Sequence, residues 1–227
     1  MTEWTAAKVV AITPETATAK TLRFALPAPS QHLAGQHYVV RLTAPDGYTA
    51  SRSYSIASAP DGTNEIELTV EYFPDGEVST FLHEVAEIGD EIEMRGPIGQ
   101  WFVWRADTPA LLVGGGSGIV PLMAMLRLAR AKGQTDLLRM LVSTRTPDDL
   151  YYANELGDDA TVVYTRADVG DRPRGRMTAG DVEPLLRPDT DVFVCGSASF
   201  ASAATDLLVD MGVPAPKIKV ERFGPSA

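Results

Sequence analysis

The first half of the chain alternates apolar and polar residues over short stretches. Between residues 65 and 72 every second position is apolar, which predicts a strand with one buried face. The same alternation recurs at 21–26, and residues 38–42 and 91–94 predict further strands. Short strands separated by Asp-Gly turn signals are typical of a small antiparallel barrel. Residues 79–85 break the pattern and predict a short helix with Ser79 as its N-cap.

The second half alternates short apolar runs with longer segments of helical period. This order predicts a five-stranded, doubly wound parallel sheet with helices on both faces. The change of period indicates two domains, residues 1–105 and 106–227, with the boundary near 104–108. The expected strands are 110–113, 137–142, 161–164, 191–195 and 218–222, and the expected helices are 119–132, 150–156, 179–186 and 199–211.

Composition removes several classes of protein. The 227 residues are 44% hydrophobic and 22% charged, which is ordinary for a folded chain. The single cysteine, Cys195, excludes an internal disulfide and a four-thiolate cluster within this chain, and the three scattered histidines suggest no metal site. No apolar run approaches the roughly 20 residues of a membrane span, and the N-terminus does not resemble a signal peptide. We therefore expect a cytoplasmic protein.

Charge is distributed unevenly along the chain. The net charge of −10 argues against a general nucleic-acid binder. Residues 1–105 carry 7 basic and 14 acidic side chains, whereas residues 106–227 carry 13 and 16. The arginine-rich second half is either an ordinary solvated surface or the site of an anionic ligand.

A glycine run, residues 114–118, stands where a buried strand gives way to a helix. Glycines there let a ligand approach the backbone, and a helix N-terminus favours phosphate. The usual dinucleotide fingerprint is incomplete, because Ile119 replaces the last small residue and Ser143-Thr144-Arg145 replaces the acidic ribose ligand. Together with Thr165-Arg166, these groups suit a ribose 2′-phosphate. A tight turn with surface arginines is the alternative interpretation.

Two weaker features lie in the first half. Arg52-Ser53-Tyr54-Ser55 reads as a strand with Arg52 and Tyr54 on one face and the two serines on the other. Gly76-Glu77-Val78-Ser79 precedes the short helix and could offer backbone amides to a pyrophosphate. Taken alone, each is ordinary barrel surface.

Six short motifs that occur in a fixed order along the chain connect these features. They are Arg52-x-Tyr54-Ser55, Gly76-x-Val78-Ser79, Gly96-Pro97-Ile98-Gly99, the run from Gly115 to Pro121, Cys195-Gly196 and Glu221-Arg222-Phe223. From about Thr18 to Phe223 the chain resembles the ferredoxin–NADP reductase family. The resemblance implies an antiparallel flavin-binding barrel followed by a pyridine-nucleotide domain, which agrees with the two periods.

The resemblance also implies roles in the barrel. Arg52 pairs with the flavin pyrophosphate, Tyr54 lies against the isoalloxazine ring, and Ser55 hydrogen-bonds near the hydride-accepting N5. The remaining cofactor-binding residues implied here are Ser53, the backbone of Val70, Glu71 and Tyr72, and the amides of Gly76, Val78 and Ser79.

In the second domain the resemblance places Cys195 near the nicotinamide C4, where it packs and positions rather than attacks. Glu221 is implied as a proton carrier or partner contact, and Phe223 as the cover of the flavin face. The residues implied to bind the nucleotide are Gly116, Ser117, Ser143, Arg145, Thr165, Arg166, Arg176, Cys195 and Gly196.

The implied activity is hydride transfer from NADPH to FAD, followed by single-electron transfer to a separate protein such as a ferredoxin, a flavodoxin or an oxygenase component. FAD is preferred to FMN as in most of the family, and the arginines favour NADPH over NADH. The alternatives are a reductase of free flavin, quinone or ferric chelates, a non-catalytic flavin-binding regulatory subunit, and a nucleotide-binding domain without flavin. The sequence leaves the oligomeric state open.

Overall fold

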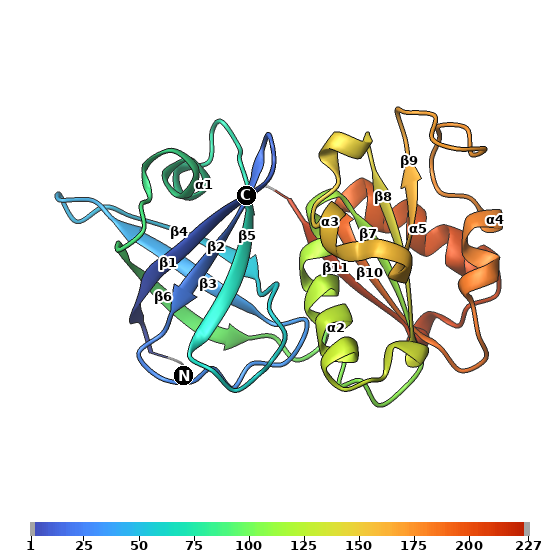
Figure 1. Ribbon diagram of the computed structural model, residues 1–227, viewed down its shortest axis with the longest axis horizontal. Coiled ribbons are helices and arrows are strands. Elements are labelled where there is room, and N and C mark those ends of the chain that lie inside the picture. The colour runs from blue at the N-terminus through green and yellow to red at the C-terminus, as the bar shows by residue number, and fades with distance from the viewer. Residues whose placement is uncertain (1–2, 225–227) are drawn as a thin grey trace.

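The computed structural model describes residues 3–224, which form an antiparallel sheet followed by a parallel one. The two lie side by side along the long axis of the molecule (Figure 1). Pro225, Ser226 and Ala227, most of the tail after Phe223, fall outside the described residues. No helix among residues 3–224 is long and apolar enough to cross a membrane.

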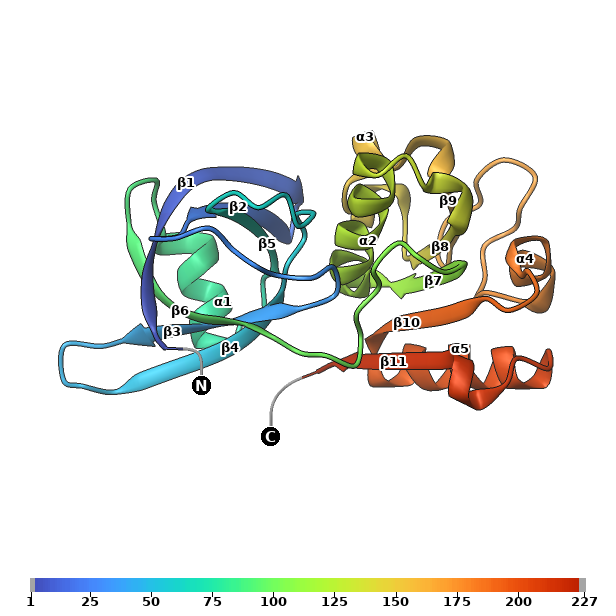
Figure 2. The same cartoon turned by 90° about the horizontal axis from the view of Figure 1, so that it is seen from below.

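The first sheet has six strands in the order β4-β3-β6-β1-β2-β5 and curls into a barrel-like layer (Figure 2). Its alternating strands bury Leu22, Phe24, Ile66 and Leu68 in one core, as their period predicted. The strands are β1 (Thr5–Thr16), β2 (Ala19–Ala25), β3 (His37–Thr43), β4 (Thr49–Ser55), β5 (Glu65–Glu71) and β6 (Glu91–Ile98).

The short helix of this half starts earlier than expected. α1 runs from Glu77 to Thr80 and continues as a wider helical turn over Phe81–Val85. The prediction of Ser79 as N-cap is wrong, because the cap position is Gly76. The Ser79 hydroxyl instead lies inside the first turn, 3.0 Å from the Gly76 carbonyl oxygen, and closes the preceding loop.

The second sheet has five parallel strands in the order β11-β10-β7-β8-β9, which confirms the doubly wound prediction. Leu112 packs with α2 on one face, whereas Leu111 and Val113 pack with α5 on the other. The elements are β7 (Ala110–Gly115), α2 (Ile119–Ala131), β8 (Leu138–Thr144), α3 (Ala153–Leu156), β9 (Ala160–Tyr164), α4 (Ala179–Val182), β10 (Asp191–Ser197), α5 (Ala198–Asp210) and β11 (Ile218–Phe223).

Two of the expected helices are shorter than their patterns suggested. Residues 150–152 are not helical, and Tyr152 has a left-handed backbone with φ of 57° and ψ of 27°, so only α3 remains of the segment 150–156. In the segment 179–186, α4 passes into a 3₁₀ turn over Glu183–Leu185, where Pro184 lacks the amide that an α-helix would use. Other 3₁₀ turns cover Gly116–Gly118, Thr135–Leu137, Pro147–Asp149, Gly157–Asp159 and Ala215–Lys217.

Candidate functional site

Strand β4 carries the first group of expected site residues. It pairs with β3 so that Arg52 lies opposite Val40 and Tyr54 opposite Tyr38. Arg52 is exposed, and within the part of the chain that the structure describes its guanidinium donates only to the neighbouring Ser51 carbonyl, at 2.9 Å. Burial raises the pKa of Tyr54, so its phenol stays protonated. Along the same strand Ser53 is exposed and Ser55 is buried.

The loop after β5 lies beside β4 and holds the second group. The phenol of Tyr48, at the start of the β4 hairpin, donates to the Glu77 carboxylate at 3.1 Å, so β4 and the start of α1 are adjacent. Val78 and Ser79 are buried in the first helical turn, whose amides have no acceptor within the helix. The Gly76 amide donates to the Phe73 carbonyl at 2.9 Å, so it is not a free donor.

The end of β5 leads into this loop through Val70, Glu71 and Tyr72. The Val70 carbonyl is 3.0 Å from Nε2 of His83, and the Tyr72 ring lies 5.5 Å from the His83 ring. Glu71 and Tyr72 are half-buried. The chain therefore presents a partly open backbone edge here, supported from behind by the helical turn.

The glycine run forms a 3₁₀ turn that leaves β7 and enters α2. A Cβ atom on Gly118 would stand 2.1 Å from the carbonyl oxygen of Cys195, so only glycine lets this turn pack against the end of β10. Gly116 is exposed with φ of 55°, and Ser117 is half-buried. This turn also contacts β5 of the barrel. The expected flavin residues at the end of β5 and the expected nucleotide residues of the glycine turn are therefore carried by elements that contact each other.

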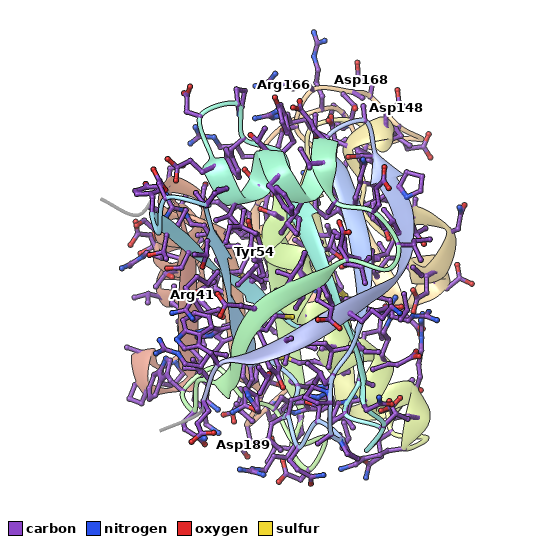
Figure 3. The ribbon with its side chains drawn as sticks, turned by 90° about the vertical axis from the view of Figure 1, so that its left-hand side faces the viewer. Arg41, Tyr54, Asp148, Arg166, Asp168 and Asp189 are labelled. Atoms are coloured by element: carbon purple, nitrogen blue, oxygen red, sulfur yellow. The ribbon has the colours of Figure 1, made fainter. Side chains whose placement is uncertain are left out.

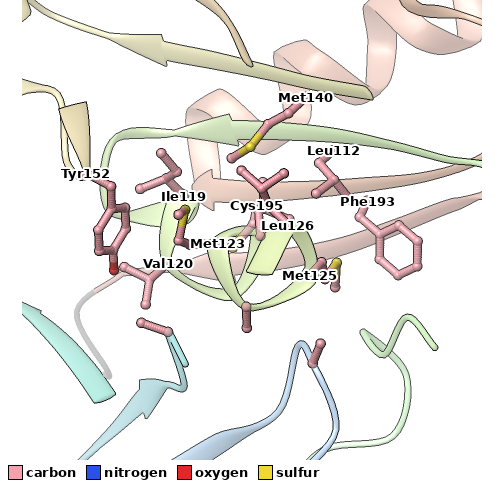
Figure 4. Packing of buried hydrophobic residues seen from close by; sticks show 14 of the residues in the cluster. Leu112, Ile119, Val120, Met123, Met125, Leu126, Met140, Tyr152, Phe193 and Cys195 are labelled. Carbon is pink, nitrogen blue, oxygen red and sulfur yellow. The ribbon is translucent and has the colours of Figure 1, made fainter. Parts of the chain in front are cut away.

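Cys195 and Glu221 lie next to each other on β10 and β11. Their Cα atoms are register partners, and Cys195 is fully buried among apolar side chains (Figure 4). Burial, and secondarily Glu221, raises the pKa of the thiol. Burial also raises the pKa of Glu221 to about 7, and its Oε2 is buried without a hydrogen-bond partner in the described residues. Phe223 ends β11, whose C-terminal end is directed toward the barrel (Figure 2).

The arginines predicted for a 2′-phosphate lie at the carboxyl edge of the sheet. The Thr165 amide donates to the Thr144 carbonyl and the Arg166 amide to the Arg145 carbonyl, each at 2.8 Å, which joins the ends of β8 and β9. Arg166 projects from the edge where Asp148 and Asp168 lie, opposite to the edge with Asp189 (Figure 3).

These arginines differ from Arg172, which lies in the same loop as Arg176, in their ion pairing. Arg145, Arg166 and Arg176 are exposed and form no ion pair within residues 3–224. Arg172, in contrast, is 2.7 Å from Asp181 and lowers the pKa of that carboxyl. The remaining expected residue of this edge, Ser143, is buried at the end of β8.

Sequence reasoning missed one residue that lines the glycine turn. Phe200, in the first turn of α5, packs its ring where Cβ atoms on Gly115 and Gly196 would stand 2.5 and 2.6 Å away. The glycines at both strand ends are therefore needed to seat this ring. The signal in the sequence is the pair of glycines, but nothing local points to a phenylalanine from another element.

Comparison with protein families covers nearly the whole chain. The model of an oxidoreductase FAD-binding domain matches residues 6–103, and that of an oxidoreductase NAD-binding domain matches residues 112–206. The two matches fall on the antiparallel and the parallel sheet, respectively.

Named relatives and solved structures share this organisation. The glycine betaine monooxygenase reductase subunit of Chromohalobacter salexigens is 32% identical over 79% of the chain, which covers 53% of that protein. The chain spans between 53% and 64% of the length of such curated relatives.

Among structures, the FAD/NAD-binding domain of the Vibrio cholerae nitric oxide dioxygenase superposes with a TM-score of 0.86 at 23% identity, covering 97% of this chain and 99% of that one. A ferredoxin NADP+ reductase from Neisseria gonorrhoeae with bound FAD and NADP gives 0.85 at 21% identity, covering 98% and 99%. These structural likenesses concern the fold.

Proposed function

Because the chain belongs to the ferredoxin–NADP reductase family, we propose that it moves hydride from NADPH to FAD and then single electrons to a separate redox protein. Residues 1–105 form the FAD domain and residues 106–227 the NADP(H) domain in this proposal. The observation that carries it is the contact between β5 and the turn Gly116–Gly118, two elements that hold candidate flavin and nucleotide residues, respectively.

The barrel residues fit a flavin with a double phosphate. Arg52 supplies an exposed guanidinium without a carboxylate partner in the described chain, and Val78 and Ser79 supply first-turn amides beside it. Tyr54, protonated and half-buried, provides an aromatic face for the ring system. The other proposed contacts are Ser53, Ser55, Val70, Glu71 and Tyr72, whereas Gly76, whose amide is engaged by Phe73, is proposed only to shape the loop. We propose FAD rather than FMN.

The second domain fits a pyridine nucleotide. Gly116 and Ser117 form an open turn at the N-terminus of α2, where a diphosphate is favoured by amides and by the helix dipole. Cys195 and Gly196 end β10 directly behind that turn, and Phe223 ends the neighbouring strand. We propose that Phe223 covers the flavin face until the nicotinamide replaces it.

Selectivity for the 2′-phosphate is assigned to the carboxyl edge of β8 and β9. Arg166, Arg145 and Arg176 form no ion pair with a carboxylate of residues 3–224, and guanidinium pairs well with phosphate. Ser143 and Thr165 add hydroxyls between them. We therefore propose a preference for NADPH over NADH.

In this mechanism the chain positions the reactants and handles a proton. Bound flavin supplies the chemistry that links a two-electron donor to one-electron acceptors. Cys195, apolar and protonated, packs beside the reacting face and keeps it dry. Ser55, buried at the end of β4, would donate a hydrogen bond to a bound flavin. Glu221, with a pKa of about 7, can hold or release a proton there near neutral pH.

The acceptor is proposed to be a separate ferredoxin, flavodoxin or oxygenase component, because relatives carry names such as monooxygenase reductase subunit. The single free cysteine, buried at the crevice, accords with a reducing cytoplasmic location, which we also propose.

Steady-state oxidation of NADPH by the purified yellow protein tests the proposal. Rapid turnover with a [2Fe–2S] ferredoxin or a flavodoxin is expected. Turnover restricted to free flavin, quinones or ferric chelates would instead identify a reductase of small acceptors. A yellow protein that oxidises no nucleotide would indicate a regulatory subunit, and a colourless protein that cannot be reconstituted with FAD would contradict the flavin site.

A further inference from the structure

A closed ring of hydrogen bonds crosses the junction of the two domains. The Tyr152 amide donates to Oε2 of Glu15 at 3.1 Å, and Oε1 of the same carboxylate accepts from the Thr21 hydroxyl at 2.7 Å. The Thr21 and Thr69 hydroxyls are 2.7 Å apart, and Thr69 in turn bonds to the Tyr152 phenol. Three strands of the barrel thus hold one residue of the nucleotide domain at both its backbone and its side chain.

The direction of the protons in this ring is fixed by its members. The Glu15 carboxylate only accepts, so the single hydroxyl proton of Thr21 points to it. Thr21 must then accept from Thr69, and Thr69 must accept from the Tyr152 phenol. Tyr152 therefore donates through both its backbone amide and its phenol. A phenylalanine at that position would leave the Thr69 hydroxyl without a donor.

The ring of hydrogen bonds explains why Tyr152 keeps a strained backbone conformation. A bulky residue rarely adopts a left-handed conformation, and such strain persists only where the surroundings over-determine it. The contacts to Glu15 and Thr69 supply that constraint, with the Arg127 guanidinium 5.3 Å from the Tyr152 ring centroid. Tyr152 is only 4% exposed, and its ring is directed toward the barrel (Figure 4).

The residues of this hydrogen-bonded ring adjoin both proposed cofactor sites. On the barrel side, Thr69 precedes Val70 at the backbone edge proposed for flavin. On the other side, the segment before Tyr152 is tied to β8, because the Thr144 hydroxyl donates to the Asp149 carbonyl at 3.1 Å. Thr144 lies between Ser143 and Arg145, which are proposed nucleotide contacts.

We propose that Tyr152 is a positioning residue, which sets the nucleotide-binding edge against the flavin strand through Thr69, Thr21 and Glu15. The inference rests on the proposed function, because it assigns a role in hydride transfer. Transfer between two bound rings is sensitive to small displacements, whereas the proposed phosphate contacts of the nucleotide are side chains and amides that these substitutions leave in place. Loss of the phenol should therefore slow hydride transfer and leave nucleotide affinity unchanged.

Anaerobic stopped-flow reduction of the flavin-loaded protein by NADPH provides the test. Tyr152→Phe and Thr69→Val should each slow flavin reduction about tenfold, with the dissociation constant for NADPH within about twofold of the parent value. The long-wavelength charge-transfer absorbance of the nicotinamide–flavin complex should weaken in parallel. The double variant should be no slower than the slower single one, because both remove the same link.

Two further variants separate positioning from general damage. Thr69→Ser keeps the hydroxyl and should retain the parent rate. Tyr151→Phe changes the adjacent buried tyrosine, whose phenol has no hydrogen bond recorded in residues 3–224, and should also behave as the parent.

The inference is overturned if Tyr152→Phe reduces at the parent rate, if its defect lies only in NADPH affinity, or if Thr69→Ser is as slow as Thr69→Val. A parent protein that NADPH fails to reduce, or one that takes up no flavin, would refute the proposed function itself and with it the role of Tyr152.

Discussion

The junction between the domains and the proposed cofactor sites differ in how their charged side chains are paired. At the junction, Arg127 is 2.7 Å from Glu67 of the barrel and 2.6 Å from Glu155 of its own domain, and it also donates to the Ala57 carbonyl at 3.0 Å. Arg23 shares Glu67 at 2.8 Å. Each of these charges is paired with another, and the contacts of Arg127 to Glu67 and Ala57 join the two domains.

The crevice and its rim hold charges that the fold does not neutralise. Arg52, Arg145, Arg166 and Arg176 form no ion pair among residues 3–224, and the buried Oε2 of Glu221 accepts no hydrogen bond there. Composition cannot separate the charges of the junction from those of the proposed cofactor sites, because both sets contain arginines and acidic residues. The arginines proposed to meet cofactors all lack an ion pair, although others, such as Arg174 and Arg187, also form none among residues 3–224. Four substitutions test this division.

The largest effect is expected from Arg52→Ala. Removing the guanidinium that we propose to pair with the pyrophosphate should weaken FAD binding about 100-fold, because bonds between charged partners are the strong ones. Fluorescence titration of the deflavinated protein measures this affinity. Arg41→Ala on neighbouring β3 is the matched control, since Arg41 is 2.8 Å from Glu93 and should leave FAD affinity unchanged. Equal losses in both variants would break the comparison.

The next effect concerns the choice between nucleotides. Arg166→Ala should lower kcat/KM for NADPH about 30-fold and leave the value for NADH nearly unchanged, because only NADPH carries the 2′-phosphate. Arg187→Ala, at an exposed arginine that donates to the Asp136 carbonyl, should alter neither value. A parallel loss with both nucleotides would place Arg166 outside the phosphate site, and a parent protein that favours NADH would remove the proposed preference.

Glu221 should make stability depend on pH in an unusual direction. Its folded pKa of about 7 lies above the ordinary 4.5, so the folded state binds the proton more tightly than the unfolded state. Stability from this group is therefore present below pH 4.5 and lost as the pH rises through 7. Between pH 5 and 8, Glu221→Gln should gain about 1–2 kcal/mol of unfolding free energy relative to the parent.

Urea unfolding at the two pH values measures this gain. Glu87→Gln removes an exposed carboxylate of the barrel and should show no pH-dependent difference from the parent. An equal gain in both variants would mean that overall charge, not burial of Glu221, controls the effect.

The smallest effect is expected where charge is paired at the surface. Arg23→Gln leaves Glu67 with Arg127 as a partner, so the free energy of unfolding should fall by less than about 1 kcal/mol, and FAD and NADPH binding should not change. Chemical unfolding and the two binding assays check this. A clear loss of cofactor affinity would show that pairing does not distinguish structural arginines from ligand-binding ones.

Much of the fold could be predicted because its strands are strongly patterned. Alternation at 65–72 and 21–26 marks β5 and β2, and the change of period marks the second sheet. The expected strands 191–195 and 218–222 put Cys195 and Glu221 at strand ends, whereas their position as register partners on neighbouring strands comes from the structure. β1 was not identified, since its run of alanines and threonines includes Pro14 and is bent by irregular register near residues 9 and 14.

What could not be predicted depends on contacts between distant segments. The pattern at 150–156 is helical, but the tertiary bonds of Tyr152 to Glu15 and Thr69 override it. Whether an arginine is paired likewise depends on partners far along the chain, as for Arg127 and Glu67. The Ser79 cap was wrong for a local reason, because the Asp75-Gly76 turn starts the helix two residues earlier.

Anaerobic titration of the FAD-loaded protein with NADPH, followed by visible absorbance, tests most directly whether the two proposed cofactor sites adjoin. We predict that one equivalent of NADPH per flavin bleaches the yellow colour, because the two proposed cofactor sites adjoin where β5 contacts the glycine turn. A protein that binds FAD and stays yellow under excess NADPH would contradict the account.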